Sequence, residues 1–476
     1  MSQHQVQEIT FGSSTSHSTP IGARIPTEIL REIFKVYAAS NPKLLDRRVV
    51  DLCLVGKFWN EAARDTPELW TKINLSFPFT HDHLAAATKR VDESKTEKID
   101  VSIDFRDPEW DAKVVELREG ANIPATNAVS GWVEEIMGVL NGTESRWKSI
   151  RVVSDTWLPL HRLMEAWTSK NPVSLESISM TRTSAVFGQA DVDLCPEKFV
   201  GPMTIFNQQI PMLRDLSLSG IHVGWNDIYG RVHNLRKLVI KNQTHGVEPT
   251  FQEFADMLSS SPRLKCLDIS GFCPRHHSGP LPPHVRKPRT PIIPLPALKE
   301  FTFGWRGTSH GCALLDMFQI GNTLKSLTLV DTRSMLDIWT GGQGWDQSSE
   351  MTFEVLRRLG KNAPRDGGKI PPRAFICMRG VKRLEIVRMR CREVGMEKFL
   401  GMMTGLEEIR LEGDDGHILT TIASVYVKRK REDRMKRVKI GWMWRVGIPM
   451  VVKRSMLNLE KAGVKVRWSE VVRSQW

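Results

Sequence analysis

Residues 213–240 read LRDLSLSGIHVGWNDIYGRVHNLRKLVI, and this stretch contains the pattern that decides the fold. It opens and closes with the same arrangement: an apolar residue, two other residues, a second apolar residue, one other residue and a third apolar residue. Because side chains alternate between the two faces of a strand, the last two apolar positions point the same way. The pattern therefore predicts a short strand with one buried face, and a helix or loop before the next strand.

The same pattern recurs along most of the chain. Clear copies begin at Leu213, Leu235, Leu264, Leu298 and Leu324, and weaker copies begin at Trp70, Trp147, Leu175, Val381, Leu406 and Met435. The steps between the clear copies are 22, 29, 34 and 26 residues. Segments with helical spacing of apolar residues, such as 251–258 and 313–318, lie between copies.

This period resembles that of leucine-rich repeats, which is about 20–29 residues. The asparagine position of the standard repeat is mostly absent, so the resemblance is to a degenerate form. It implies an α/β solenoid in which parallel strands alternate with helices and neighbouring repeats share one core. A last helix and strand at 456–468 would cap the stack. Two segments break the period: 274–297 holds eight prolines and predicts an extended loop, and 340–373 predicts a second insertion with a short helix at 353–359.

Residues 24–70 carry a different pattern. Apolar residues at helical spacing follow Pro26, a second periodic stretch runs from Val49 to Trp59, and Thr66-Pro67 marks a third helix start. Three short helices bury little surface by themselves. We therefore expect this module to pack on a partner or on the next domain.

Three segments of the module, in the same order, resemble an F-box. They are Ile25-Pro26-x-Glu28-Ile29-Leu30-x-x-Ile33-Phe34, Leu52-Cys53-Leu54-Val55-x-Lys57-x-Trp59 and Thr66-Pro67-Glu68-Leu69-Trp70. Ile25 stands where the family has Leu, and Gly56-Lys57-Phe58 replaces a more basic pair. The resemblance implies that this module contacts its adaptor through Pro26, Ile29, Leu30, Ile33, Leu52, Val55 and Trp59. An ordinary helical bundle, whose apolar stripe is only core, is the alternative.

The domain organisation expected from these patterns has three parts: a polar disordered tail at 1–23, an F-box at 24–69 and a repeat domain at 70–476. No apolar run approaches the ~20 residues of a membrane helix, and the N-terminus does not resemble a secretory signal. Seven scattered cysteines suggest reduced thiols and a cytoplasmic or nuclear location. Of the net charge of +13, +6 comes from 428–439, KRKREDRMKRVK, which is either a nuclear-import signal or a solvated segment.

Catalytic and metal-binding motifs are not recognisable in the sequence. It contains no nucleotide-binding loop, nucleophile elbow or HExxH motif, so we expect no enzyme activity and no cofactor. Cys266, Cys273, His276 and His277 form the nearest metal-like cluster, but their spacing fits no standard zinc site. His81-Asp82-His83 is expected in a surface loop, and Asp414-Asp415 in a solvated turn.

The resemblance implies a substrate-recognition subunit of a cullin-type (SCF) ubiquitin ligase. The F-box would bind a Skp-type adaptor, and through it a cullin, while the repeats would bind an unidentified protein substrate. Two alternatives are a repeat scaffold without a ubiquitin role and a basic nucleic-acid-binding protein. Charges of both signs on the strand residues between the apolar positions favour a protein partner.

For the substrate, we expect contacts with aromatic and basic residues on one rim of the repeats. These residues are Trp305, Arg306, Arg383, Arg410, Trp442, Trp444 and Arg445. The alternative is that the tryptophans pack the loops, because tryptophan is usually well buried.

Overall fold

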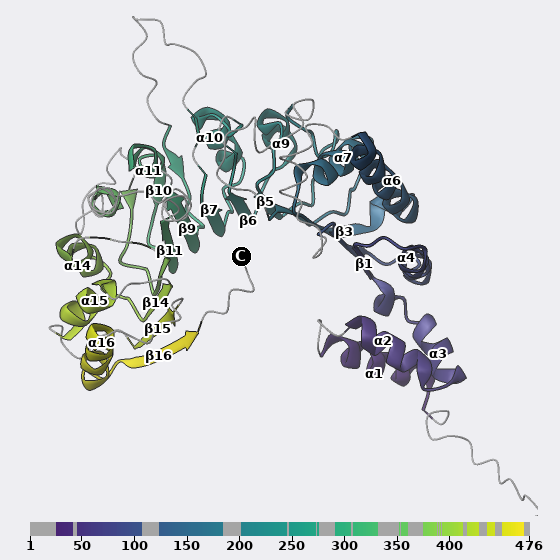
Figure 1. The fold of residues 1–476 in the computed structure, drawn as a ribbon, viewed down its shortest axis with the longest axis horizontal. Helices are drawn as coiled ribbons and strands as arrows, with labels where there is room; N and C mark the ends of the chain where they lie inside the picture. Colours follow the sequence, from purple (N-terminus) through teal and green to yellow (C-terminus); the bar gives the residue numbers. More distant parts are fainter. Residues whose placement is uncertain are drawn as a thin grey trace, which may run out of the picture. The chain divides into compact units, whose positions relative to one another are not determined.

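A computed structural model of the chain gives the fold (Figure 1). It describes residues 25–40, 45–106, 123–183, 201–244, 247–272, 274–275, 291–305, 308–331, 352, 354–359, 375–387, 389, 391, 393–412, 417–427, 436–442 and 450–470. The chain divides into two compact units. The first contains residues up to 72 together with 89–97, and the second contains 73–88 and the residues from 98 onward.

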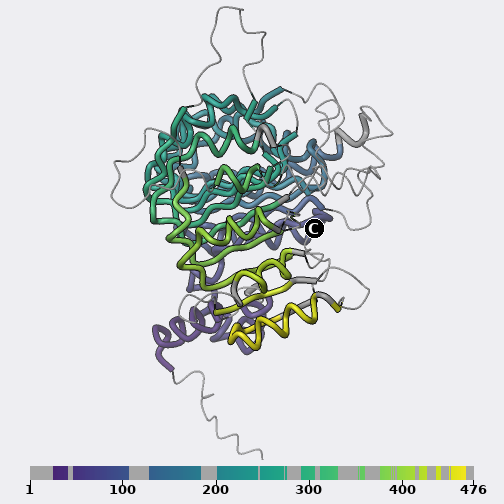
Figure 2. Tube along the Cα trace, turned by 90° about the vertical axis from the view of Figure 1, so that its left-hand side faces the viewer, coloured from purple at the N-terminus to yellow at the C-terminus, as the bar shows by residue number. Residues whose placement is uncertain are grey.

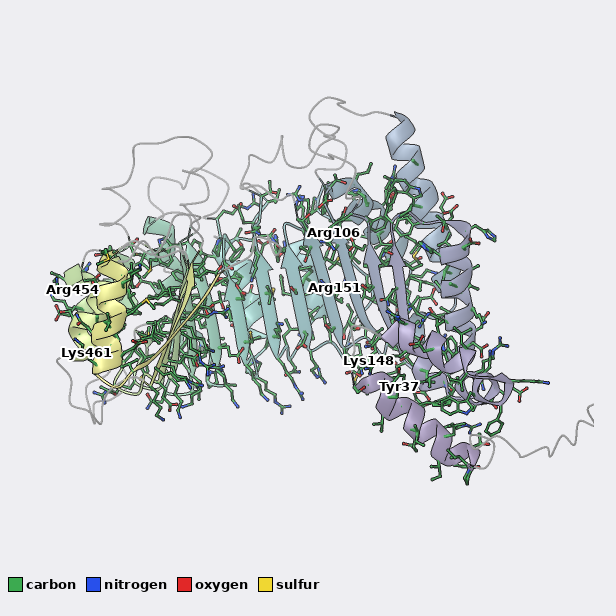
Figure 3. All side chains as sticks on the ribbon, turned by 60° about the horizontal axis from the view of Figure 1, so that its bottom comes forward. Tyr37, Arg106, Lys148, Arg151, Arg454 and Lys461 are labelled. Atoms are coloured by element: carbon green, nitrogen blue, oxygen red, sulfur yellow. The ribbon has the colours of Figure 1, made fainter. Side chains whose placement is uncertain are left out.

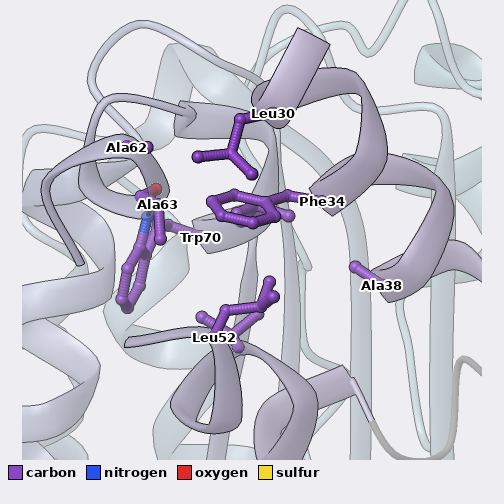
Figure 4. Close-up of a cluster of buried hydrophobic side chains, with 9 residues drawn as sticks. Leu30, Phe34, Ala38, Leu52, Ala62, Ala63 and Trp70 are labelled. Atoms are coloured by element: carbon purple, nitrogen blue, oxygen red, sulfur yellow. Dashed lines mark hydrogen bonds between the residues drawn. The ribbon is translucent and has the colours of Figure 1, made fainter. Parts of the chain in front are cut away.

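The first unit is built from short helices. They are α1 (Thr27–Ala39), α2 (Leu45–Leu54), α3 (Lys57–Arg64) and the single 3-10 turn η3 (Pro67–Trp70). Nine buried side chains form its core: Leu30, Phe34, Ala38, Val49, Leu52, Ala62, Ala63, Leu69 and Trp70 (Figure 4). The indole Nε1 of Trp70 donates to the carbonyl oxygen of Ala63 at 2.9 Å, so the last turn is tied to α3.

Two details of this unit differ from the sequence prediction. The periodic stretch from Val49 to Trp59 is two helices rather than one, because Gly56 stands between them as the N-cap of α3. The third helix expected at Thr66-Pro67 is only a four-residue 3-10 turn.

The second unit contains a 13-stranded sheet whose strand order follows the chain. Its strands are β1 (Lys72–Ser76), β2 (Ile99–Asp104), β3 (Trp147–Ser154), β4 (Ser177–Arg182), β5 (Asp215–Ser219), β6 (Lys237–Lys241), β7 (Cys266–Ile269), β9 (Glu300–Trp305), β11 (Ser326–Asp331), β13 (Arg383–Val387), β14 (Glu408–Glu412), β15 (Arg437–Trp442) and β16 (Lys465–Glu470). All neighbouring strands from β2 to β16 are parallel. The prediction of an α/β architecture with parallel strands is confirmed.

Helices connect the strands and cover one face of the sheet (Figure 1). They are α4 (His81–Glu93), α6 (Ile123–Leu140), α7 (Trp157–Trp167), α9 (Trp225–Arg231), α10 (Phe251–Ser259), α11 (Thr308–Leu315), α14 (Glu393–Gly401), α15 (His417–Val427) and α16 (Met450–Lys461), with the 3-10 turn η4 (Glu144–Arg146) before β3. Figure 2 shows successive repeats of this unit stacked in chain order. We call the other side of the sheet the open face.

Burial alternates along many of the strands, as the repeated pattern predicts. In β5, Leu216 and Leu218 are buried while Asp215 and Ser217 are half-buried. The parallel register then places Leu216 beside Leu238 of the next strand, so apolar side chains form continuous rows under the helices. Stacked rows of this kind bury apolar surface that one repeat could not bury alone.

A second, three-stranded sheet was not expected from the sequence. It contains β12 (Phe375–Ile376), β10 (Phe318–Ile320) and β8 (Ile293–Pro294), all parallel. Residues 293–294 therefore form a strand instead of part of the predicted loop, and Phe318 belongs to β10 instead of a helix. Ile293, Phe318 and Ile376 are all buried, which explains why these short segments pair.

Most of the two predicted insertions lies outside the described residues, except that 354–359 is helical as predicted. Among the helices in the described part of the chain, none is both long enough and apolar enough to cross a bilayer.

Candidate functional site

Exposed apolar side chains concentrate in the first unit. Of the thirteen large apolar side chains exposed in the described part of the chain, seven lie between residues 29 and 55. They are Ile29, Ile33, Val36, Tyr37, Val50, Leu54 and Val55, with exposed fractions of 40–77%. We call these seven residues the α1–α2 surface.

Helix α1 is apolar on two sides. Leu30, Phe34 and Ala38, four residues apart, face the core. The exposed residues Ile29, Ile33, Val36 and Tyr37 repeat at the same helical spacing on another side. A surface helix of a soluble protein usually has one apolar side, and a contiguous exposed apolar patch marks an interaction site.

Polar contacts fix the C-terminal half of α1. The Arg48 guanidinium on α2 donates to the carbonyl oxygen of Tyr37 and to the hydroxyl of Ser40, and it lies 4.7 Å from the centroid of the Tyr37 ring. Lys35 Nζ lies 2.7 Å from Glu68 Oε1 of η3. This hydrogen bond raises the pKa of Lys35 and lowers the pKa of Glu68. These contacts hold α1 against both α2 and η3.

The structure separates the seven predicted adaptor-binding residues into two groups. Pro26, Ile29, Ile33 and Val55 are exposed. Leu30 is fully buried and Leu52 is 5% exposed, so both belong to the core and the prediction that they face a partner is corrected. Their side chains point toward neighbouring helices of the unit, where they fill its interior.

Trp59 is half-buried and packs on Phe34, with ring centroids 5.2 Å apart. The prediction also missed four members of the α1–α2 surface: Val36, Tyr37, Val50 and Leu54. The available signal was helical spacing: Val36 and Tyr37 lie three and four residues after Ile33, and Leu54 lies four residues after Val50.

The predicted substrate-binding residues are also divided. Arg383 and Arg410 are exposed on the open face of β13 and β14, and Arg410 Nε lies 3.4 Å from Glu385 Oε1. Trp305 is 1% exposed and stacks on Phe303 with centroids 5.5 Å apart, so its predicted place on an exposed rim is wrong. The Trp442 side chain and residues Arg306, Trp444 and Arg445 lie outside the described residues.

Metal binding and thiol chemistry find little support in the described residues. His81, Asp82 and His83 begin α4 instead of lying in a loop, and His81 and Asp82 are almost fully exposed. No group of three or more His, Cys, Asp and Glu residues is placed to hold a metal ion within the described ranges. Cys273, His276, His277, Asp414 and Asp415 lie outside them.

Burial raises the pKa of four thiols, those of Cys53, Cys266, Cys312 and Cys391, and so disfavours their reactive form. Burial raises the pKa of Cys266 to about 11 and the pKa of Cys391 to about 12. A nucleophilic cysteine needs the opposite shift, because the thiolate is the reactive form.

Comparison of the chain with models of known protein families and with curated proteins finds no match. Two surfaces of the molecule therefore bear on its function: the α1–α2 surface and the open face of the sheet.

Proposed function

We propose that this chain is the substrate-recognition subunit of a cullin-type (SCF) ubiquitin ligase. The first unit would be an F-box that binds a Skp-type adaptor. The second unit would be a leucine-rich-repeat-like solenoid that binds a protein substrate. The α1–α2 surface is the observation that carries this proposal.

The α1–α2 surface suits a stable protein partner. Removing apolar surface from water contributes about 25 cal/mol per Å². Six large apolar side chains on α1 and α2, with Val55 directly after α2, supply such surface. The ion pairs Arg31–Asp65 (3.6 Å) and Lys35–Glu68 provide polar groups on the same unit. An apolar centre with a polar rim is the usual composition of a protein interface.

The partner is inferred from the motif. Ile29 and Ile33 occupy F-box motif positions in this sequence and are exposed, as are Leu54 and Val55 of the second motif segment. The open face of the second unit supports substrate binding, because its side chains are polar and charged over many consecutive strands. A polar surface on a rigid scaffold favours specific recognition.

Adaptor binding tests the proposal. The double variant Ile33→Asp/Leu54→Asp places two charges in the α1–α2 surface without touching the core, so we expect loss of co-purification with a Skp-type adaptor. Leu457→Asp is the matched control, because Leu457 is equally exposed but lies on α16 of the second unit. Thermal melting should be unchanged in both. Adaptor binding that survives the double variant, or that Leu457→Asp also abolishes, contradicts the proposal.

A further inference from the structure

A line of basic residues crosses the sheet where its strands begin. In six consecutive copies of the pattern, the residue after the leading apolar position is basic and lies at this edge: Arg214, Arg236, Lys265, Lys299, Lys325 and Lys382. We call these six residues the basic row. In Figure 3, Lys148 marks the same edge on β3, whereas Arg106 lies beyond the opposite end of β2.

Backbone hydrogen bonds show that the basic row is continuous. The N–H of Arg236 donates to the carbonyl oxygen of Arg214 at 2.7 Å, and the N–H of Lys265 donates to that of Arg236 at 2.8 Å. The same bond links Lys265 to Lys299, Lys299 to Lys325 and Lys325 to Lys382, at 2.8–2.9 Å. Since neighbouring strands lie about 4.8 Å apart, six positive charges follow one another over about 24 Å.

Glutamates occupy the positions at both ends of the row. The N–H of Arg214 donates to the carbonyl oxygen of Glu176, and the N–H of Glu407 donates to that of Lys382. Glu176 forms an ion pair with Lys98 at 3.1 Å, and Glu407 forms one with Lys382 at 3.1 Å. The line of uninterrupted positive charge is therefore limited to six strands.

Most of the basic row has no counter-ion among the residues that the structure describes. Arg236, Lys265, Lys299 and Lys325 are exposed and form no ion pair with any described residue. Arg214 is half-buried, and its guanidinium donates to the backbone oxygens of Pro211 and Leu213. Charges of one sign at this spacing repel one another, and a bound anion would relieve that repulsion.

The neighbouring residues indicate the form of the anion. The next position on the open face carries Asp215 on β5 and Glu300 on β9, but also Lys237 on β6 and Arg383 on β13. The charges at this second position cancel, so the uninterrupted positive charge is one residue wide. A double helix lying across it would meet these carboxylates. A single nucleic-acid strand usually stacks its bases on aromatic side chains, but the described residues next to the row in sequence include none. A thin, extended acidic peptide satisfies both conditions.

We propose that the basic row binds an acidic segment of a partner protein, laid across the strand starts in extended form. The inference rests on the proposed function in one respect: the segment would belong to the substrate presented for ubiquitination. An extended peptide advances about 3.3 Å per residue, so seven or eight residues span the row. Its negative groups are carboxylates or phosphates, because both pair with lysine and arginine.

Fluorescence anisotropy with labelled octapeptides tests this proposal on the full-length chain. The probes are octaglutamate, an octapeptide of alternating phosphoserine and glycine, and octaglutamine. We expect at least one anionic peptide to bind ten or more times more tightly than octaglutamine at 50 mM salt. Its affinity should fall at least tenfold at 300 mM salt, because salt screens exposed charges. Comparison of the two anionic peptides distinguishes carboxylate from phosphate recognition.

Two triple variants with the same change in net charge locate the site. Lys265→Ala/Lys299→Ala/Lys325→Ala removes the centre of the row and should weaken binding at least tenfold. Lys453→Ala/Arg454→Ala/Lys461→Ala removes three exposed charges from α16 (Figure 3) and should change binding less than twofold. Lys265→Arg/Lys299→Arg/Lys325→Arg keeps the charges and should retain binding, which separates lost charge from lost folding.

Several results would overturn the inference. Equal losses in the two alanine variants would show that only net charge matters, and equal affinity for octaglutamine would exclude a charge-selective site. Tighter binding of a twelve-nucleotide oligouridylate than of either acidic peptide would exclude a peptide as the preferred partner. Adaptor co-purification is measured in parallel: if the wild type binds acidic peptides at the row but no adaptor, the ligase proposal fails and the peptide site stands.

Discussion

Truncation to alanine should impair folding at one residue of α1 and adaptor binding at its neighbour. Leu30 is fully buried in the nine-residue core, whereas Ile29 is 54% exposed on the α1–α2 surface. Leu30→Ala should destabilise the first unit by about 3–5 kcal/mol, since a buried leucine loses both its transfer free energy and its packing. A unit of this size has a total stability of roughly 3–8 kcal/mol, so the loss is most of it.

Ile29→Ala should affect binding instead of folding. Full burial of such a side chain is worth about 1.5–3 kcal/mol, and about half of Ile29 is still available for burial in the free protein. The truncation should therefore weaken adaptor affinity by about 0.8–1.5 kcal/mol, which is about a four- to twelvefold rise in Kd.

Hydrogen exchange of the α1–α3 segments measures the first effect, and calorimetric titration with the adaptor measures the second. Leu30→Ala should speed exchange of protected amides by about two orders of magnitude or more, while Ile29→Ala should leave exchange near the wild-type rate. Equal acceleration by both variants would refute the assignment of the two sides of α1. An unchanged adaptor Kd in Ile29→Ala would refute the binding role of the exposed side.

Two further predictions concern the second unit. Trp305→Ala should destabilise the second unit by about 3–5 kcal/mol and speed hydrogen exchange in β9 and β11. Hydrogen exchange at the wild-type rate would show that Trp305 is not a core residue. Cys266 and Cys391 should resist iodoacetamide near pH 8 in the folded chain, with labelling followed by mass spectrometry. Because burial raises the pKa of Cys266 to about 11 and that of Cys391 to about 12, their neutral forms stabilise the fold below the unfolded pKa near 9, and this stabilisation is lost as pH rises through 11–12. Rapid labelling at pH 8 without unfolding would contradict these shifts.

The strands of the main sheet were largely predictable because the repeated pattern couples local alternation to a fixed starting residue. The prediction missed strand β2. Ile99, Val101 and Ile103 alternate as regularly as the apolar residues of any copy, but the residue three positions before Val101 is Lys98, which is not apolar. Trp305 was also predictable in retrospect. It follows Phe301 and Phe303 at two-residue spacing, so its side chain lies on the buried side of β9.

Other features depend on contacts between distant segments. Helical spacing predicted apolar residues along α1, but which of them are core and which are exposed is decided by the packing of α2, α3 and η3. The small sheet of β8, β10 and β12 joins three segments spread over more than eighty residues. The basic row, in contrast, was readable: a lysine or arginine directly follows the first apolar residue in Leu213-Arg214 and in five further copies of the pattern. Its continuity required the backbone ladder of the parallel strands.

The agreement between strand order and chain order has a consequence for synthesis on the ribosome. From β2 to β16, each new strand of the 13-stranded sheet pairs with the strand of that sheet that precedes it in the chain. At about 5–20 residues per second, the 22 residues from the start of β5 to the start of β6 emerge in roughly one to four seconds, much longer than a helix or a local pairing needs to form. The 13-stranded sheet can therefore grow at its carboxyl-terminal edge while translation continues, whereas β10 pairs with β12 only after the chain as far as residue 376 has been made.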